Sequence, residues 1–176
     1  MGEIRDKETS SIAIEAALTG HLVFSTVHTN DAPLAVTRMI DLGVEPFLLT
    51  ATLAAIVAQR LVRKVCTNCK VMYDPSVDVL MEIGLEPGDV VGKQFAYGKG
   101  CDACHFTGFK GRTAIFETLK MSDRMRELIM DGAATDQLRR VAKEQGMRSL
   151  RDSGLLAIFD GLTTVEEVLR ETIDIM

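Results

Sequence analysis

The segment HLVFSTVHTND (His21–Asp31) decides the fold class, because it joins a short apolar run to a polar turn and a helix start. HLVFSTV is too short for a helix and rich in strand formers, which is typical of a buried parallel strand. HTND favours a turn, and Asp31 can cap a helix that has Pro33 in its first turn and ends at Leu42 before Gly43. A strand followed by a helix predicts an α/β fold with a mostly parallel sheet.

Further helices are predicted on both sides of this segment. TSSIAIEAAL (Thr9–Leu18) has helix-forming character, and Gly20 is well placed to end it. FLLTATLAAIVAQ (Phe47–Gln59) is apolar on nearly every side, which predicts a buried helix. These elements place residues 1–65 in the α/β core.

The acidic start of the chain is a second candidate feature. If Met1 and Gly2 end a strand of the same sheet, Glu3 lies at the edge where His28 follows its own strand. A carboxylate at such an edge can orient a water molecule for attack on a phosphate. The alternative is that Glu3, Arg5 and Asp6 are solvated charges around a loop, and that His28 is structural.

Composition bounds the class of protein. The 176 residues suffice for one large domain or two small ones, and 47% hydrophobic with 26% charged residues excludes wholesale disorder. No apolar run approaches the roughly 20 residues that span a bilayer, and the start of the sequence lacks the basic and apolar regions of a signal peptide, so we expect a cytoplasmic protein without membrane insertion. The net charge of −5 argues against nucleic-acid binding.

Four cysteines form two tight pairs, Cys66-x-x-Cys69 and Cys101-x-x-Cys104. Two such turns can place four thiolates around one zinc ion, in a closed tetrahedral site that stabilises structure and leaves no position for substrate. A redox pair and four inert thiols remain the alternatives, and His105 could replace one thiolate. The sequence therefore predicts a zinc subdomain over residues 66–111.

Residues 112–176 are expected to form a strand followed by a small helical domain. The strand is RTAIFETLKM (Arg112–Met121), and a short helix over about Val77–Ile83 lies inside the cysteine subdomain. The helical domain has four predicted helix starts: caps at Ser122 and Thr135, a helix from about Ser149 to Asp160, and a capping box of Thr163 and Glu166 that opens a last helix through Thr172.

Several stretches together resemble one family. GEIRDKETSSIAIEAALTGHLVFSTVHTNDAPLAVTRM is similar to the Walker B and histidine-box region of the secretion ATPases that power type II secretion and type IV pilus assembly. AQRLVRKVCTNCK, GCDACHFTGFKGRTAIFE and RDSGLLAIFDGLTTVEEVLR match the same family in the same order. The resemblance covers nearly the whole chain, and the cysteine segment resembles assembly and secretion motors rather than retraction motors.

The resemblance implies a role for each site residue. Glu3 corresponds to the Walker B glutamate that polarises the attacking water, and Arg5 and Asp6 belong to the same motif as nucleotide-site support. His21 and His28 fall in the histidine box, with His28 as the sensor of the γ-phosphate. The zinc ligands are the four cysteines, Cys66, Cys69, Cys101 and Cys104.

The resemblance also implies an architecture and partners. The chain would be the C-terminal part of a RecA-like P-loop ATPase core, with a zinc subdomain and a small C-terminal helical domain. The family works as a hexamer that hydrolyses ATP with Mg²⁺, at the cytoplasmic face of the inner membrane against a platform protein of the pilus or secretion machine. The P-loop pattern G-x-x-x-x-G-K-[ST] is absent from the 176 residues, so we expect this chain alone to be inactive.

Two other functions compete with the motor. One is a zinc-stapled protein-interaction module without nucleotide chemistry. The other is a zinc-ribbon nucleic-acid binder, which is disfavoured by the acidic balance and by an aromatic content of 5% without tryptophan to stack on bases.

Overall fold

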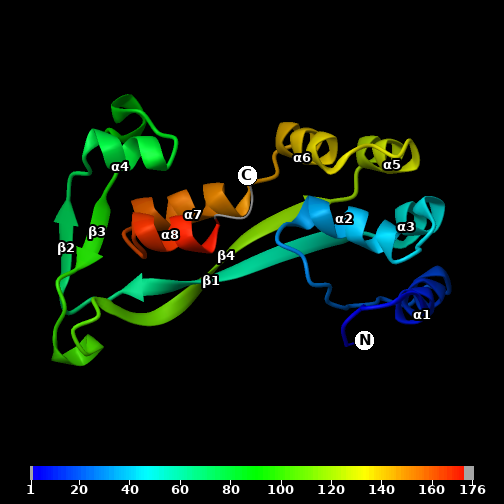
Figure 1. Cartoon of the computed structure of the whole chain (residues 1–176), viewed down its shortest axis with the longest axis horizontal. Helices are drawn as coiled ribbons and strands as arrows, with labels where there is room; N and C mark the ends of the chain where they lie inside the picture. The colour runs from blue at the N-terminus through cyan, green and yellow to red at the C-terminus, as the bar shows by residue number, and fades with distance from the viewer. Residues whose placement is uncertain (1, 173–176) are drawn as a thin grey trace. The chain divides into compact units, whose positions relative to one another are not determined.

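The computed structural model describes residues 2–172, which divide into two compact units (Figure 1). Of the described residues, the first unit comprises 2–58 and 117–147, and the second comprises 59–116 and 148–172. Strands β1 (Ala55–Val65) and β4 (Phe109–Lys120) pair with each other, and each contributes residues to both units. Within residues 2–172 no helix is both long and apolar enough to cross a bilayer.

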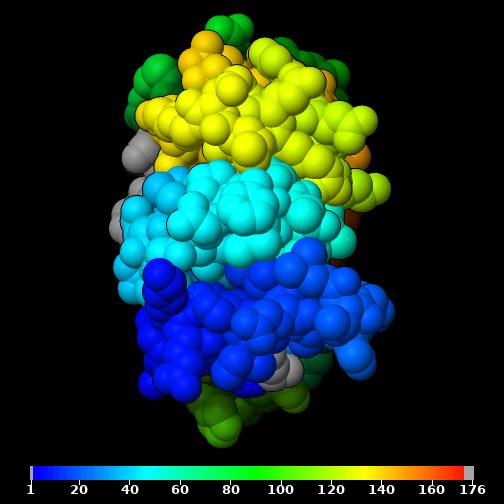
Figure 2. Space-filling model, turned by 90° about the vertical axis from the view of Figure 1, so that its right-hand side faces the viewer, coloured from blue at the N-terminus to red at the C-terminus, as the bar shows by residue number. Residues whose placement is uncertain are grey.

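The first unit is mainly helical. Its helices are α1 (Lys7–Leu18), α2 (Ala32–Asp41), α3 (Pro46–Thr52), α5 (Asp123–Met130) and α6 (Thr135–Glu144). Figure 2 shows one face of this unit as three bands, with α2 and α3 in cyan between the blue α1 and the yellow α5 and α6. The middle band therefore contacts helices from both ends of the unit's sequence.

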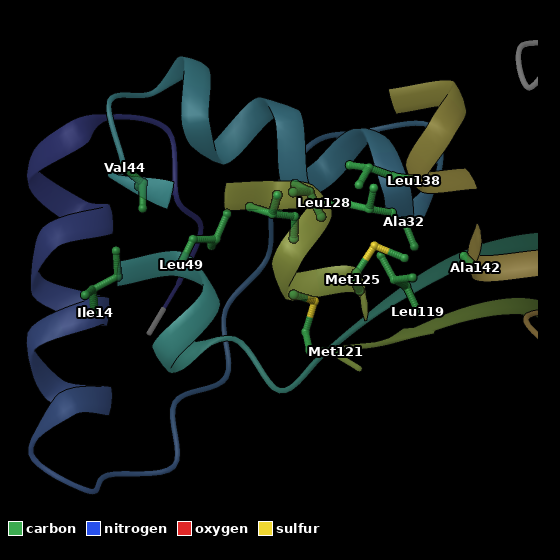
Figure 3. Close-up of a cluster of buried hydrophobic side chains, with 12 residues drawn as sticks. Ile14, Ala32, Val44, Leu49, Leu119, Met121, Met125, Leu128, Leu138 and Ala142 are labelled. Carbon is green, nitrogen blue, oxygen red and sulfur yellow. The ribbon is translucent and has the colours of Figure 1, made fainter. Parts of the chain in front are cut away.

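An apolar core joins these helices to the ends of the strands. Leu49 of α3, Met125 of α5 and Leu138 of α6 are almost completely buried, together with Leu119 of β4 (Figure 3). Burial of each such side chain stabilises the fold by about 1.5–3 kcal/mol. The core thus holds residues from before β1 and after β4 in one unit.

Local hydrogen bonds set where the helices begin. Asp31 accepts from the Leu34 N–H at 2.7 Å, and Ser122 accepts from the Met125 N–H at 3.2 Å, so both predicted caps are confirmed. The predicted cap at Thr135 is wrong by one residue, because Ala134 is the N-cap and Thr135 is already helical. Its hydroxyl instead forms a 2.7 Å hydrogen bond with Thr37 of α2.

The predicted helix over Phe47–Gln59 is wrong beyond its first half. α3 ends at Thr52, and β1 begins at Ala55. The stretch is apolar enough to fit either structure, but partly buried and exposed residues alternate along β1, which is the period of a strand. Pairing with β4 supplies partners for the backbone groups of β1, and this tertiary contact overrides the local helix propensity.

The predicted strand over His21–Val27 is reduced to a bridge. Thr26 pairs with Glu3 in a parallel bridge, through hydrogen bonds from the Ile4 N–H to Thr26 O at 2.8 Å and from the Thr26 N–H to Gly2 O at 3.3 Å. Leu22 and Phe24 are 81% and 75% exposed, so the prediction that this run is buried is wrong for the residues that the structure describes. A buried strand needs neighbours along both edges, and in residues 2–172 the pairing is confined to this short bridge.

The second unit contains an antiparallel hairpin, β2 (Lys70–Tyr73) with β3 (Phe95–Gly98), in the register Lys70–Gly98 to Tyr73–Phe95. Its helices are α4 (Val77–Glu82), α7 (Leu150–Phe159) and α8 (Val165–Glu171), with 3₁₀ turns at Pro87–Val90 and Asp102–Cys104. Phe95, Ile158 and Val168 are the centre of its apolar core. The short helix predicted at Val77 and the helix predicted from about Ser149 to Asp160 are both confirmed, and Ser149 is the N-cap of the latter.

The last helix begins one residue later than predicted. Thr164 is the N-cap of α8 and accepts from the Glu167 N–H, so the capping box of Thr163 and Glu166 is wrong. The strand predicted after the cysteines, from Arg112, begins three residues earlier, at Phe109. At the start of α8, the Thr163 hydroxyl donates to the Arg63 carbonyl at 2.9 Å. Arg63 also donates to Glu167 of α8 from its backbone N–H, Nε and Nη2.

Glu167 fixes α8 to β1 within the second unit. Its carboxylate is almost fully buried and accepts from the Arg63 N–H at 2.9 Å and from Arg63 Nη2 at 2.7 Å. Arg170 Nη2 forms an ion pair with it at 2.7 Å. Burial alone would raise the pKa of Glu167, but the hydrogen bonds from Arg63 outweigh it and lower the pKa. The pair therefore contributes stability at neutral pH that is lost as acid protonates Glu167.

Candidate functional site

The four cysteines lie together at one end of the hairpin. All four Sγ atoms lie within 4.8 Å of one another, with separations of 3.9 Å for Cys66–Cys101 and Cys69–Cys104 and 3.8 Å for Cys101–Cys104. Four thiolates placed tetrahedrally at about 2.3 Å from a zinc ion are about 3.8 Å apart. The donor set and its spacing fit a structural zinc ion.

Backbone hydrogen bonds shape each cysteine pair into a tight turn. The Cys69 N–H donates to Cys66 O at 3.3 Å, and the Cys104 N–H donates to Cys101 O at 3.1 Å. The Cys66 N–H also donates to Gly108 O at 2.9 Å, which joins the two turns. Gly98 is required beside them, because a Cβ there would overlap the carbonyl oxygen of Gly108.

The thiol groups receive N–H donors, as metal-bound thiolates do. The Gly100 N–H donates to Cys69 Sγ at 3.3 Å, and the Cys101 N–H donates to Cys104 Sγ at 3.2 Å. Burial raises the pKa of Cys69 to about 12, whereas at Cys104 burial is outweighed by backbone donors that lower the pKa to about 6. His105 is exposed and lies outside the group of four sulfur atoms.

A second cluster forms where Gly2–Ile4 pairs with Thr26. His28 Nε2 lies 2.7 Å from Glu3 Oε1, and Arg5 Nε donates to Glu3 Oε2 at 2.6 Å. The bridge between Glu3 and Thr26 brings the two segments side by side, which places His28 two residues beyond the pairing. The His28 side chain is 85% exposed, so its contact with Glu3 is open to a ligand.

Glu3 is held as a carboxylate in this cluster. The hydrogen bond from Arg5 is the main cause that lowers the pKa of Glu3. Burial opposes it as the next largest effect, and the charges of Arg5 and His28 lower the pKa further. An ionised carboxylate with a neighbouring imidazole can accept a proton from water or bind a polar group between them.

The other predicted residues lie at the two ends of α1. Asp6 caps this helix and accepts from the Thr9 N–H at 2.8 Å, a bond that lowers the pKa of Asp6. His21 Nδ1 lies 3.0 Å from the Thr19 hydroxyl, beyond the last turn of the same helix. The structure therefore brings His28 and Arg5 to Glu3, and gives Asp6 and His21 local helix-end contacts.

Sequence reasoning missed two contacts at the start of α2, the ion pair of the Asp31 cap and the role of Glu117. Asp31 Oδ2 accepts from Arg139 Nη2 at 2.7 Å, in addition to its role as the cap. Glu117 Oε1 accepts from the Ala32 N–H at 2.7 Å. Arg139 and Glu117 lie far from Asp31 in the sequence, so no local pattern connects them.

Comparison with protein families gives a match over most of the chain. The family model described as "Type II/IV secretion system protein" matches residues 1–170. A relative in Thermus thermophilus, the type IV pilus assembly ATPase PilB, is 47% identical over 174 residues, which are 99% of this chain and 20% of the relative. The type II secretion system protein HxcR of Pseudomonas aeruginosa is 46% identical over 174 residues, which are 99% of this chain and 33% of HxcR.

Solved structures share the fold at lower identity. The ATPase DotB of Yersinia pseudotuberculosis aligns with 98% of this chain and 36% of its own chain, at a TM-score of 0.65 and 23% identity. The pilus retraction motor PilT with bound ADP aligns with 97% of this chain and 38% of its own, at a TM-score of 0.63 and 24% identity. These alignments confirm the predicted fold class, and the chain spans about a fifth to two fifths of the proteins it matches.

Proposed function

Because this chain belongs to the type II/IV secretion system protein family, we propose that it is part of a hexameric ATPase that powers type IV pilus assembly or type II secretion. Relatives named for each process are similarly close, at 47% and 46% identity, so the proposal covers both. The motor would act in the cytoplasm against an inner-membrane platform protein of its machine.

The observation that carries this proposal is the 2.7 Å contact between Glu3 and His28. In the proposed mechanism the Glu3 carboxylate polarises the water that attacks the terminal phosphate of ATP, which requires an ionised acceptor. His28 binds the γ-phosphate, and its contact with Glu3 couples the bound phosphate to the position of the Glu3 carboxylate. The exposure of the imidazole supports this role, because the group has room to meet a ligand.

The remaining site residues support these two. Arg5 keeps Glu3 ionised and oriented through its hydrogen bond. Asp6 begins α1 and so fixes the backbone that follows Glu3, and His21 is bound at the end of the same helix. Mg²⁺ would accompany ATP, and the phosphate cradle would come from a P-loop, a pattern that the 176 residues lack.

We assign zinc a structural role in the second unit. Four cysteine ligands fill the tetrahedral coordination of the ion and leave no position for water or substrate. The ion would join the turn after β1 to the turn before β4 and so stabilise the segment between these two strands. A zinc-stapled interaction module without nucleotide chemistry is the alternative function, since this site by itself requires no ATP.

The test is ATP turnover by a chimera. Residues 1–170 replace the matched segment of the Thermus thermophilus assembly ATPase, which supplies its own remaining chain. We expect the chimera to hydrolyse ATP and the 176-residue chain alone to release phosphate at background rate, because the chain lacks a P-loop pattern. A folded, oligomeric chimera without turnover would contradict the motor and favour the interaction module.

A further inference from the structure

The loop that carries His28 is short and anchored at both ends. Before it, Thr26 pairs with Gly2 and Ile4 through two backbone hydrogen bonds. After it, Asp31 begins α2 as its cap. Val27–Asn30 therefore spans the distance between two fixed points, and the position of His28 depends on both of them.

The second anchor is a buried network rather than a simple helix cap. The Asp31 side chain is 3% exposed, and its two oxygens have different partners: Oδ1 accepts from the Leu34 N–H and Oδ2 accepts from Arg139 Nη2 and Nε, at 2.7 and 3.3 Å. Glu117 accepts from the adjacent Ala32 N–H. The start of α2 is thus held by β4 and by α6 as well as by its own cap.

Arg139 is suited to hold this anchor from outside the loop. It lies on α6, packs against Asp31 with its side chain 27% exposed, and is kept in place by a second carboxylate, Asp136, one turn earlier on the same helix. Removing the cation of a buried ion pair is strongly destabilising. Without Arg139, the Asp31 carboxylate would keep the Leu34 N–H but lose the partner of its other oxygen.

We propose that Arg139, acting through Asp31, is a positioning residue that keeps His28 against Glu3. A catalytic consequence of this positioning rests on the proposed ATPase function. The positioning of His28 by Arg139 is a property of this chain and needs no nucleotide. It follows that a displacement of α6 is transmitted to His28 through one ion pair, which links a helix remote in sequence to the candidate site.

The test uses NMR on the isotope-labelled 176-residue chain to measure how far a change at Glu3 alters the chemical shift of His28. The change in the His28 imidazole Cε1–H resonance on Glu3→Gln is recorded at one pH, first in the native background and then in Arg139→Ala. We expect the change to fall by at least about half when Arg139 is absent, because His28 no longer stays beside Glu3. Arg140→Ala, an exposed neighbour on the same helix, should leave it intact.

Asp31→Asn provides a second variant that keeps the helix cap. Asparagine still accepts from the Leu34 N–H but loses the charge that binds Arg139. We expect the same loss of coupling in Asp31→Asn, with the amide spectrum of α1 and α5 unchanged. If Glu3→Gln changes the His28 resonance as much in either folded variant as in the native background, the proposal is overturned. This measurement needs no ATP, so a chimera that fails to hydrolyse ATP would contradict the proposed function without affecting the result here.

Discussion

Replacing Glu3 with glutamine is expected to lower the ATP turnover of the chimeric motor by about 100-fold or more. Glutamine keeps the shape of the side chain and its contact with Arg5, but it cannot accept a proton from the attacking water. In the structure Arg5 holds Glu3 as a carboxylate by lowering its pKa, and His28 lies 2.7 Å away. The measurement is steady-state phosphate release at saturating ATP.

The loss should fall on kcat rather than KM, since Glu3 is proposed to act on the transition state. Glu8→Gln is the matched control, because Glu8 is an exposed glutamate in the first turn of α1 and is expected to change turnover little. Turnover within a factor of about two of the native rate in Glu3→Gln would be incompatible with a catalytic carboxylate at this position.

Replacing Cys101 with serine is expected to lower the zinc content from about one ion per chain to nearly none. The remaining three thiolates cannot complete the tetrahedral site, and Cys101 Sγ lies within 3.9 Å of two of them. Structural zinc contributes roughly 10 kcal/mol or more in small zinc folds, so residues 66–108 should lose protection against hydrogen exchange. Elemental analysis and exchange measured by mass spectrometry check both effects.

Asn68→Ala is the control for this change, because Asn68 is exposed within the first cysteine turn and is not a ligand. It should retain zinc and the native exchange pattern. The zinc assignment fails if the native chain, purified under reducing conditions, is folded and contains no metal. It also fails if Cys101→Ser keeps both the ion and the exchange protection.

Some features set by local bonds could be predicted from the sequence, although the caps predicted at Thr135 and Thr163 are each wrong by one residue. The caps at Asp31 and Ser122 depend on a bond to a residue three positions later, and the structure confirms both. The family was predicted from the order of its motifs, and it is confirmed by the match over residues 1–170. The cysteine pairs meet as their spacing predicted, whereas the identity of the metal as zinc stays a prediction.

Features set by contacts distant in sequence could not be predicted. The stretch after Thr52 is apolar enough for a helix or a strand, and only its pairing with β4 decides that β1 forms. The ion pair of Asp31 with Arg139 likewise joins residues with no shared local pattern. The catalytic roles of Glu3 and His28 stay predictions, although the two side chains are in contact.

A double-mutant cycle on ATP turnover tests most directly whether Glu3 and His28 act as one unit. The chimeric motor is compared with Glu3→Gln, with His28→Ala and with the variant that carries both changes. If the contact between the two side chains is what drives hydrolysis, the double variant should be about as slow as Glu3→Gln alone. Losses that multiply, so that the double variant is slower by the product of the two single effects, would show that the residues act independently and would contradict the proposed site.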